Sequence, residues 1–349
     1  MTITRRNLMK TTGAAGMAVI GATVLPKAAR ANEFTLRLHQ FLPAQANIPA
    51  QVLDPWADAI EEQSGGRITV ERYPSMQLGG TPPDLIDQAI DGIADVVWTV
   101  AGYTPGRFPR TEVFELPFMM TSAGPTSRAY WTMAERHMMD ADFAAFKPIA
   151  VWVHGPGLIH SSTPIRTPAD LNGVKLRAPT RVTNAMFSNL GATTVGMPVP
   201  AIPEALSRGV VDATVIPWEV VGILRVQELV ENHTIFPNAS LYTTSFIFGM
   251  NQASYDALPA DLQAVIDANS GADTSEWAGR TMQEFDEPSR IAAEDRGNNI
   301  IELSEDEVNM WREAAQPTID NWVAEMDEAG MDGTGLLAEA RALIAEYSA

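Results

Sequence analysis

Phe34-Thr35-Leu36-Arg37-Leu38 begins the stretch that decides the fold, because apolar and polar side chains alternate along it as in a short strand. A helical pattern follows over residues 48–63, and residues 68–73 are typical of a second strand. Thr81 is a candidate N-cap for the next helix, and the apolar run 94–100 predicts a buried strand. This alternation predicts a mainly parallel sheet covered by helices on both faces.

A second α/β unit follows after Lys147, where the same alternation restarts. Strands are expected at 149–153, 174–178, 193–197 and 211–216, with helices at 182–190 and 203–208. From Pro259 to Arg296 the pattern is helical, interrupted only by Gly271, Gly279 and Pro288. A helix or broken pair of that length exceeds what one domain needs and can bridge two. We therefore predict an α/β protein of two lobes with a long bridging helix.

The composition excludes several classes of protein. The chain has 349 residues, 46% of them hydrophobic, which is ordinary for a globular protein of about two domains. Asp and Glu number 43 against 24 Lys and Arg, so the formal net charge is −19. Such a surface repels phosphate groups, which argues against nucleic acid and anionic membrane surfaces as partners. The absence of cysteine excludes disulfides, iron–sulfur clusters and thiol chemistry.

Residues 1–31 have the three parts of an export signal. Thr4-Arg5-Arg6-Asn7-Leu8-Met9-Lys10 is basic, an apolar segment follows over 11–25, and small residues precede the expected cleavage site at Ala31. The arginine pair resembles a twin-arginine signal, with an ordinary secretory signal as the alternative. The apolar segment is too short and too rich in Gly and Ala to span a bilayer, so we expect no membrane anchor.

Motifs for catalysis and cofactor binding are missing from the sequence. The five histidines form no HExxH motif or other close pair that suits a metal ion. No G-x-S-x-G elbow, G-x-x-x-x-G-K phosphate loop or G-x-G-x-x-G turn occurs. We therefore expect no catalytic residue, metal or cofactor, and the sequence favours a protein that is not an enzyme. An exported enzyme is the alternative, because twin-arginine export often serves folded cofactor proteins.

Asn172-Gly173-Val174-Lys175-Leu176-Arg177-Ala178-Pro179 carries the sharpest signal for a binding site. It places Arg177 at the carboxyl end of a predicted strand, the end at which open α/β sheets bind their ligands. Apolar residues flank Arg177, so its guanidinium emerges at an apolar rim, where it can hold a carboxylate through two parallel hydrogen bonds. A surface arginine paired with an acid is the alternative.

The segments around Arg177 carry a resemblance to a known family. A predicted helix, Asn189-Leu190-Gly191-Ala192, Gly196-Met197-Pro198 and the run Pro203–Asp212 (PEALSRGVVD) follow it in order. This succession resembles the solute-binding subunits of tripartite ATP-independent periplasmic (TRAP) transporters, of the dicarboxylate-receptor (DctP) type. Segments 36–39, 78–80, 92–95, 115–118 and 258–263 extend the resemblance over nearly the whole chain after residue 31.

The resemblance implies a two-lobed fold like that of periplasmic binding proteins, with an organic acid bound in the cleft between the lobes. It implies that the receptor works in the periplasm and delivers the acid to a TRAP membrane permease. We expect lobe I to comprise residues 32–153 plus 243–282, and lobe II residues 154–242 plus 283–349. A receptor of the same fold that serves a signalling partner is the alternative.

The resemblance also assigns a role to Arg177, which matches the family's arginine that holds the ligand carboxylate. The sequence departs from the family pattern at Ile216, which stands before Pro217 where the family usually has an asparagine. Gly155-Pro156-Gly157-Leu158 stands where some members carry a second arginine. These departures predict a small or relatively apolar monocarboxylate as the ligand, with keto acids and aromatic acids as candidates.

Further candidates for the pocket lie at or after the carboxyl ends of the predicted strands. They are Gln40, Phe41, Trp98, Trp152, His154, Thr180, Trp218 and Glu219. Core packing is the alternative for each tryptophan, because indole rings fill α/β cores readily. A structural role is the alternative for His154, and a rim or hinge charge for Glu219. Inside the pocket, Glu219 would accept a hydrogen bond from a ligand hydroxyl.

Overall fold

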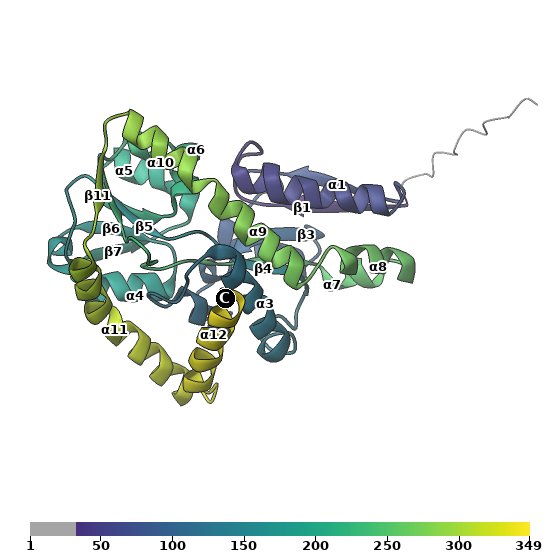
Figure 1. Ribbon diagram of the computed structural model, residues 1–349. Coiled ribbons are helices and arrows are strands. Elements are labelled where there is room, and N and C mark those ends of the chain that lie inside the picture. Colours follow the sequence, from purple (N-terminus) through teal and green to yellow (C-terminus); the bar gives the residue numbers. More distant parts are fainter. Residues whose placement is uncertain (1–32) are drawn as a thin grey trace, which may run out of the picture.

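Two β-sheets organise the protein, whose computed structural model describes residues 33–349 (Figure 1). The first sheet has the strand order β2-β1-β3-β10-β4. Its strands are β1 (Phe34–His39), β2 (Ile68–Tyr73), β3 (Val96–Val100), β4 (Lys147–Val153) and β10 (Ser245–Met250). Strand β1 pairs in parallel with β2 and β3, whereas β10 is inserted antiparallel between β3 and β4. The predicted export signal lies outside the described residues.

The second sheet has the strand order β11-β9-β5-β8-β6-β7. Its strands are β5 (Leu158–Ser161), β6 (Lys175–Ala178), β7 (Thr193–Gly196), β8 (Ala213–Ile216), β9 (Asn232–Ile235) and β11 (Asn299–Glu302). Strand β6 is parallel to β7 and β8, and β5 is antiparallel to β8 and β9. Each sheet therefore contains one antiparallel strand in an otherwise parallel arrangement, and the predicted two-lobed α/β fold is confirmed.

Helices cover both sheets (Figure 1). They are α1 (Asp54–Gln63), α2 (Leu85–Ile90), α3 (Ala123–His137), α4 (Arg181–Asn189), α5 (Ile202–Ser207), α6 (Trp218–Leu224), α7 (Gln252–Asp256), α8 (Ala260–Ala268), α9 (Ala272–Glu284), α10 (Asp286–Asp295), α11 (Glu305–Glu328) and α12 (Gly333–Tyr347). Helices α1, α2, α3 and α9 pack on the first sheet, and α4 packs on β6 and β7 of the second. Within residues 33–349, no helix combines the length and the apolar character that crossing a membrane requires.

The predicted bridge corresponds to α9 and α10, which are separated only by Phe285. Figure 1 shows α9 beside the first sheet and α10 beside the second, with α9 packed on α3 and α10 on α6. The helical pattern is interrupted at Gly271, whose φ is +100° and which directly precedes α9, after α8 has ended at Ala268. Gly279 lies inside α9, where a Cβ atom would stand 2.2 Å from Ser127 Oγ of α3. Pro288 falls in the first turn of α10, where its missing N–H is not needed.

The C-terminal helix α12 lies beside the first sheet, although residues 283–349 were expected to belong with the second lobe. Its buried residues include Leu336 and Leu343, and the helix packs on α3 and on α11. Polar contacts join α12 to α3, since His137 Nε2 lies 2.7 Å from Glu339 Oε2. An amphipathic helix packs wherever its apolar stripe is covered, and here α3 covers it. The lobe boundaries stay a prediction.

Candidate functional site

A cavity lies between the two sheets, and both contribute residues to its wall. The space between its lining residues that holds no protein atom is about 410 Å³, open solvent included. The wall is mostly apolar and aromatic. It is formed by Phe41, Leu42, Trp98, Val100, Tyr103, His154, Arg177, Pro179, Val199, Val215, Ile216, Pro217, Glu219, Val220, Tyr242, Thr244, Phe246 and Met282. Six of the residues predicted from the sequence are in this wall, namely Phe41, Trp98, His154, Arg177, Ile216 and Glu219.

Arg177, on strand β6, is the one arginine or lysine in this wall, and it is only 1% exposed. Its Nε donates to the carbonyl of Met197 at 2.9 Å, and its Nη1 donates to that of Val215 at 3.1 Å. Its Nη2 has no hydrogen-bond partner, and none of the ion pairs in residues 33–349 includes it. A buried cation without a counter-ion is costly, so the cavity is suited to an anionic group.

Two tyrosines lie beside the guanidinium and were missed by the sequence analysis. The Tyr103 hydroxyl accepts a hydrogen bond from the Val199 N–H at 2.9 Å, whereas the buried Tyr242 hydroxyl has no partner. Burial lowers the pKa of Arg177, and these two phenols oppose that shift. Tyr103 lies three residues after the end of β3, so its position after a strand could have indicated it. Tyr242 precedes β10, a strand that the sequence analysis did not predict, so no local signal indicated it.

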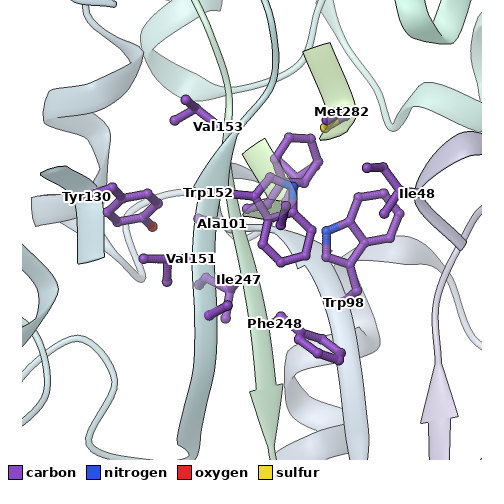
Figure 2. Packing of buried hydrophobic residues seen from close by; sticks show 14 of the residues in the cluster. Ile48, Trp98, Ala101, Tyr130, Val151, Trp152, Val153, Ile247, Phe248 and Met282 are labelled. Atoms are coloured by element: carbon purple, nitrogen blue, oxygen red, sulfur yellow. The ribbon is translucent and has the colours of Figure 1, made fainter. Parts of the chain in front are cut away.

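A stack of aromatic rings forms the cavity wall on the side of the first sheet. Trp98 is parallel to Phe41 at 4.6 Å between ring centroids and to Phe246 at 5.3 Å. Behind the wall, Trp152 lies parallel to Trp98 at 6.0 Å, and Figure 2 shows the two indoles side by side above Phe248. Flat rings with an apolar surface favour a flat apolar ligand, because offset stacking adds to the burial of area.

Polar contacts join the two sides of the protein around the cavity. Tyr103, in the 3₁₀ turn Ala101–Tyr103 after β3, meets Val199 in the turn Val199–Ala201 after β7. Arg181 at the start of α4 forms a bidentate ion pair with Glu112, which lies in the turn Pro109–Glu115. These contacts, made by residues far apart in the chain, hold the walls of the cavity together.

Glu219 is a buried acid in the wall, 2% exposed, in the first turn of α6. Its backbone N–H donates to Asp286 Oδ1 at 2.8 Å, which attaches α6 to the start of α10. Its Oε2 lies 3.4 Å from Asn47 Nδ2, and its Oε1 has no partner. Burial, and secondarily Asp286, raises the pKa of Glu219 to about 8. Burial raises the pKa of Asp286 to about 7.

The raised pKa of Glu219 predicts a pH-dependent stability. At neutral pH the carboxyl is protonated in the folded protein and ionises on unfolding. The free energy of unfolding of wild type is therefore unaffected by this group below about pH 4.5 and falls as pH rises from there toward 8. In Glu219→Gln this loss is absent. We expect the free energy of unfolding of the variant to rise relative to wild type by up to about 1.4 kcal/mol per pH unit across that window. Urea denaturation at about pH 5 and about pH 8 measures it, and a constant difference would contradict the prediction.

His154 follows β4 and lines the cavity as a neutral side chain. Burial lowers its pKa to about 4, and the charge of Arg177 acts in the same direction. Its Nδ1 lies 2.5 Å from the carbonyl of Gly155, and its ring meets that of Tyr242 edge to face at 5.5 Å. The imidazole therefore completes the wall around the tyrosine and adds no charge to the site.

Four residues that the sequence analysis placed in the pocket do not line the cavity. Trp152 stacks behind Trp98, one ring away from the cavity. Trp218 turns toward a buried histidine pair, His160 and His233, whose Nδ1 atoms lie 2.7 Å apart. The other two satisfy backbone groups. Gln40 bonds to both backbone groups of Leu42, and Thr180 is the N-cap of α4, bonded to Thr183.

Two lobes with an anion-accepting cavity between them define the class of solute-binding receptors. The chain belongs to the bacterial extracellular solute-binding protein family 7, whose profile matches residues 40–326. This finding confirms the predicted resemblance to TRAP solute-binding subunits. Members of this family are receptors that bind solutes outside the cytoplasm.

Solved structures of TRAP solute-binding proteins agree closely with this fold. One from Rhodoferax ferrireducens, in complex with copurified benzoate, is 47% identical with a TM-score of 0.88 and covers 90% of this chain and 98% of its own. One from a marine metagenome is described as specific for aromatic acid ligands and is bound to metahydroxyphenylacetate. It is 44% identical with a TM-score of 0.88, and the match covers 91% of this chain and 100% of its own. A third, from Bordetella bronchiseptica with bound mandelate, is 26% identical with a TM-score of 0.83, covering 89% and 99%.

Proposed function

We propose that this receptor binds an aromatic monocarboxylate in the cavity between its two sheets. The observation that carries the proposal is the buried Arg177 guanidinium, whose free Nη2 faces no acid of the described protein in a cavity walled by aromatic rings. A ligand carboxylate supplies the missing counter-ion, with Nη2 and the free Tyr242 hydroxyl as its donors. The aromatic ring of the ligand then lies against Trp98, Phe41 and Phe246.

The wall favours one carboxylate over two. Beyond Arg177 it contains no second arginine or lysine, and its one acidic residue is Glu219. A second ligand carboxylate would be buried without a cation, which is unfavourable. The ligands of the similar receptors from Rhodoferax ferrireducens and the marine metagenome, benzoate and metahydroxyphenylacetate, are aromatic acids with a single carboxylate and support this assignment.

Within this proposal, the receptor works in the periplasm and delivers the acid to a TRAP membrane permease. Its similarity to TRAP solute-binding proteins supports that role. Uptake of labelled benzoate into proteoliposomes that contain the permease tests it. Uptake that does not depend on the added receptor would contradict the delivery step.

Thermal melting of the purified protein tests the ligand class. After refolding to remove carried ligand, benzoate at 100 times its dissociation constant should stabilise the protein by about 2.7 kcal/mol and raise Tm by several degrees. Succinate and sialic acid at the same concentration should leave Tm unchanged. A shift with succinate and none with benzoate, hydroxybenzoates or mandelate would refute an aromatic monocarboxylate as the ligand.

A further inference from the structure

We propose that Glu219 is the specificity-determining residue that makes the cavity prefer aromatic acids bearing a ring hydroxyl. The inference rests on the proposed function, since it presumes that the ligand carboxylate is held at Arg177. It assigns the opposite end of the ligand to a residue that has no role in holding the carboxylate.

The geometry leaves one oxygen of Glu219 open to a ligand. The backbone of Glu219 is held by Asp286, and its Oε2 is held by Asn47. Its Oε1 is buried without a partner, while the residue lines the cavity. A buried polar atom without a partner is unfavourable, so a ligand that completes its hydrogen bonding is preferred.

Glu219 and Arg177 occupy separate parts of the wall. Arg177 is on β6 of the second sheet, and the ionisable groups that act on it are the phenols of Tyr103 and Tyr242. Glu219 is on α6, and Asp286 is the ionisable group that acts on it. The two residues form no ion pair with each other, although both are buried in one cavity. A ligand carboxylate bound at Arg177 therefore leaves Glu219 free to contact another part of the ligand.

The part of the cavity wall at Glu219 suits a hydroxyl group of the ligand. A phenol or alcohol donates to a carboxyl oxygen and accepts from a protonated carboxyl, and burial keeps Glu219 in its protonated form at neutral pH. A ring that ends in C–H leaves Oε1 without a partner. A second carboxylate on the ligand would lose its hydration beside the Glu219 carboxyl with no cation to pair with it, so dicarboxylates are rejected.

Calorimetric titration of the full-length purified protein tests the inference with benzoate, 3-hydroxybenzoate and 4-hydroxybenzoate. We expect wild type to bind the better hydroxybenzoate at least about tenfold more tightly than benzoate. Glu219→Leu should bring this ratio close to one, because leucine removes the hydrogen-bond partner of the ligand hydroxyl. Glu219→Met serves in place of Glu219→Leu if the latter does not fold, and Glu219→Gln, which keeps a donor and an acceptor, should retain most of the preference.

Glu115 provides a matched control. It is also buried, with Oε1 bonded to the Ser245 N–H at 3.0 Å and Oε2 unpartnered, but it does not line the cavity. Glu115→Gln should therefore keep the wild-type ratio. Equal affinity of wild type for all three acids, or an unchanged ratio in a folded Glu219→Leu, would overturn the role of Glu219 and leave the proposed function standing. If no aromatic acid binds to wild type, the proposed function fails, and the inference fails with it.

Discussion

Arg177→Met should abolish the binding of aromatic monocarboxylates while the protein stays folded. In wild type the guanidinium is 1% exposed, with two of its nitrogens bonded to backbone carbonyls and Nη2 free for the ligand. Without it, the ligand carboxylate is buried with no counter-ion, which costs about 3–5 kcal/mol. We expect benzoate affinity to fall by about 10²- to 10³-fold or more. Isothermal titration calorimetry measures this change.

The stability of the same variant separates a binding role from a structural one. Replacing an unpaired buried cation with an apolar side chain of similar length is neutral or stabilising, so we expect the Tm of the ligand-free variant to equal or exceed that of wild type. Arg177→Lys keeps the charge but loses the fork of two parallel donors, and it should bind with intermediate affinity. Near-native affinity in Arg177→Met would remove this residue from the site.

Trp98→Ala should lower both the stability and the affinity of the receptor. Trp98 is 1% exposed and stacks on Phe41, Phe246 and Trp152, so its removal leaves a large hole in the core of the first sheet. Losses of this kind are about 3–5 kcal/mol. The indole also forms part of the cavity wall, and we expect benzoate to bind at least about tenfold more weakly. Urea denaturation and calorimetry measure the two effects.

Trp152→Ala is the matched control for this variant. Trp152 is fully buried in the same stack but does not line the cavity. Trp152→Ala should therefore lower the free energy of unfolding by a similar amount but weaken benzoate binding much less than Trp98→Ala does. If Trp152→Ala weakened benzoate as much as Trp98→Ala, the two indoles would share one role in core packing, and direct contact of Trp98 with the ligand would be ruled out.

Several site residues were predictable because they lie at or just after the carboxyl end of a strand, where ligands bind in open α/β sheets; we call this the strand-end rule. Arg177 is the last residue but one of β6, and Phe41 and His154 follow β1 and β4 within two residues. Because parallel strands present their carboxyl ends at one edge of a sheet, residues at those ends are brought together without knowledge of the strand order. The rule says nothing about which way a side chain turns. Trp218 follows β8 as expected, yet its ring packs on His160 and His233 instead of facing the cavity.

The pairing of strand β10 is a feature that local sequence patterns do not predict. It inserts between β3 and β4, and it places Phe246 opposite Val100 on one side and Trp152 on the other. This pairing adds Phe246 to the stack beside Trp98 and leaves Trp152 behind the wall. Nothing in the sequence near Trp98 or Trp152 specifies a partner from residues 245–250, since sheet pairing joins segments regardless of their separation in the chain.

The sequence by itself determined the alternation of strands and helices, the two lobes, the family and the position of Arg177 at a strand end, because each depends on local periodicity or on a contiguous motif. The tertiary structure decided which aromatic rings face the cavity, the placement of Tyr242 beside Arg177, the attachment of Glu219 to Asp286 and the packing of α12 on α3. These features depend on contacts between residues far apart in the chain, where the burial of shared surface, and not local propensity, selects the partner.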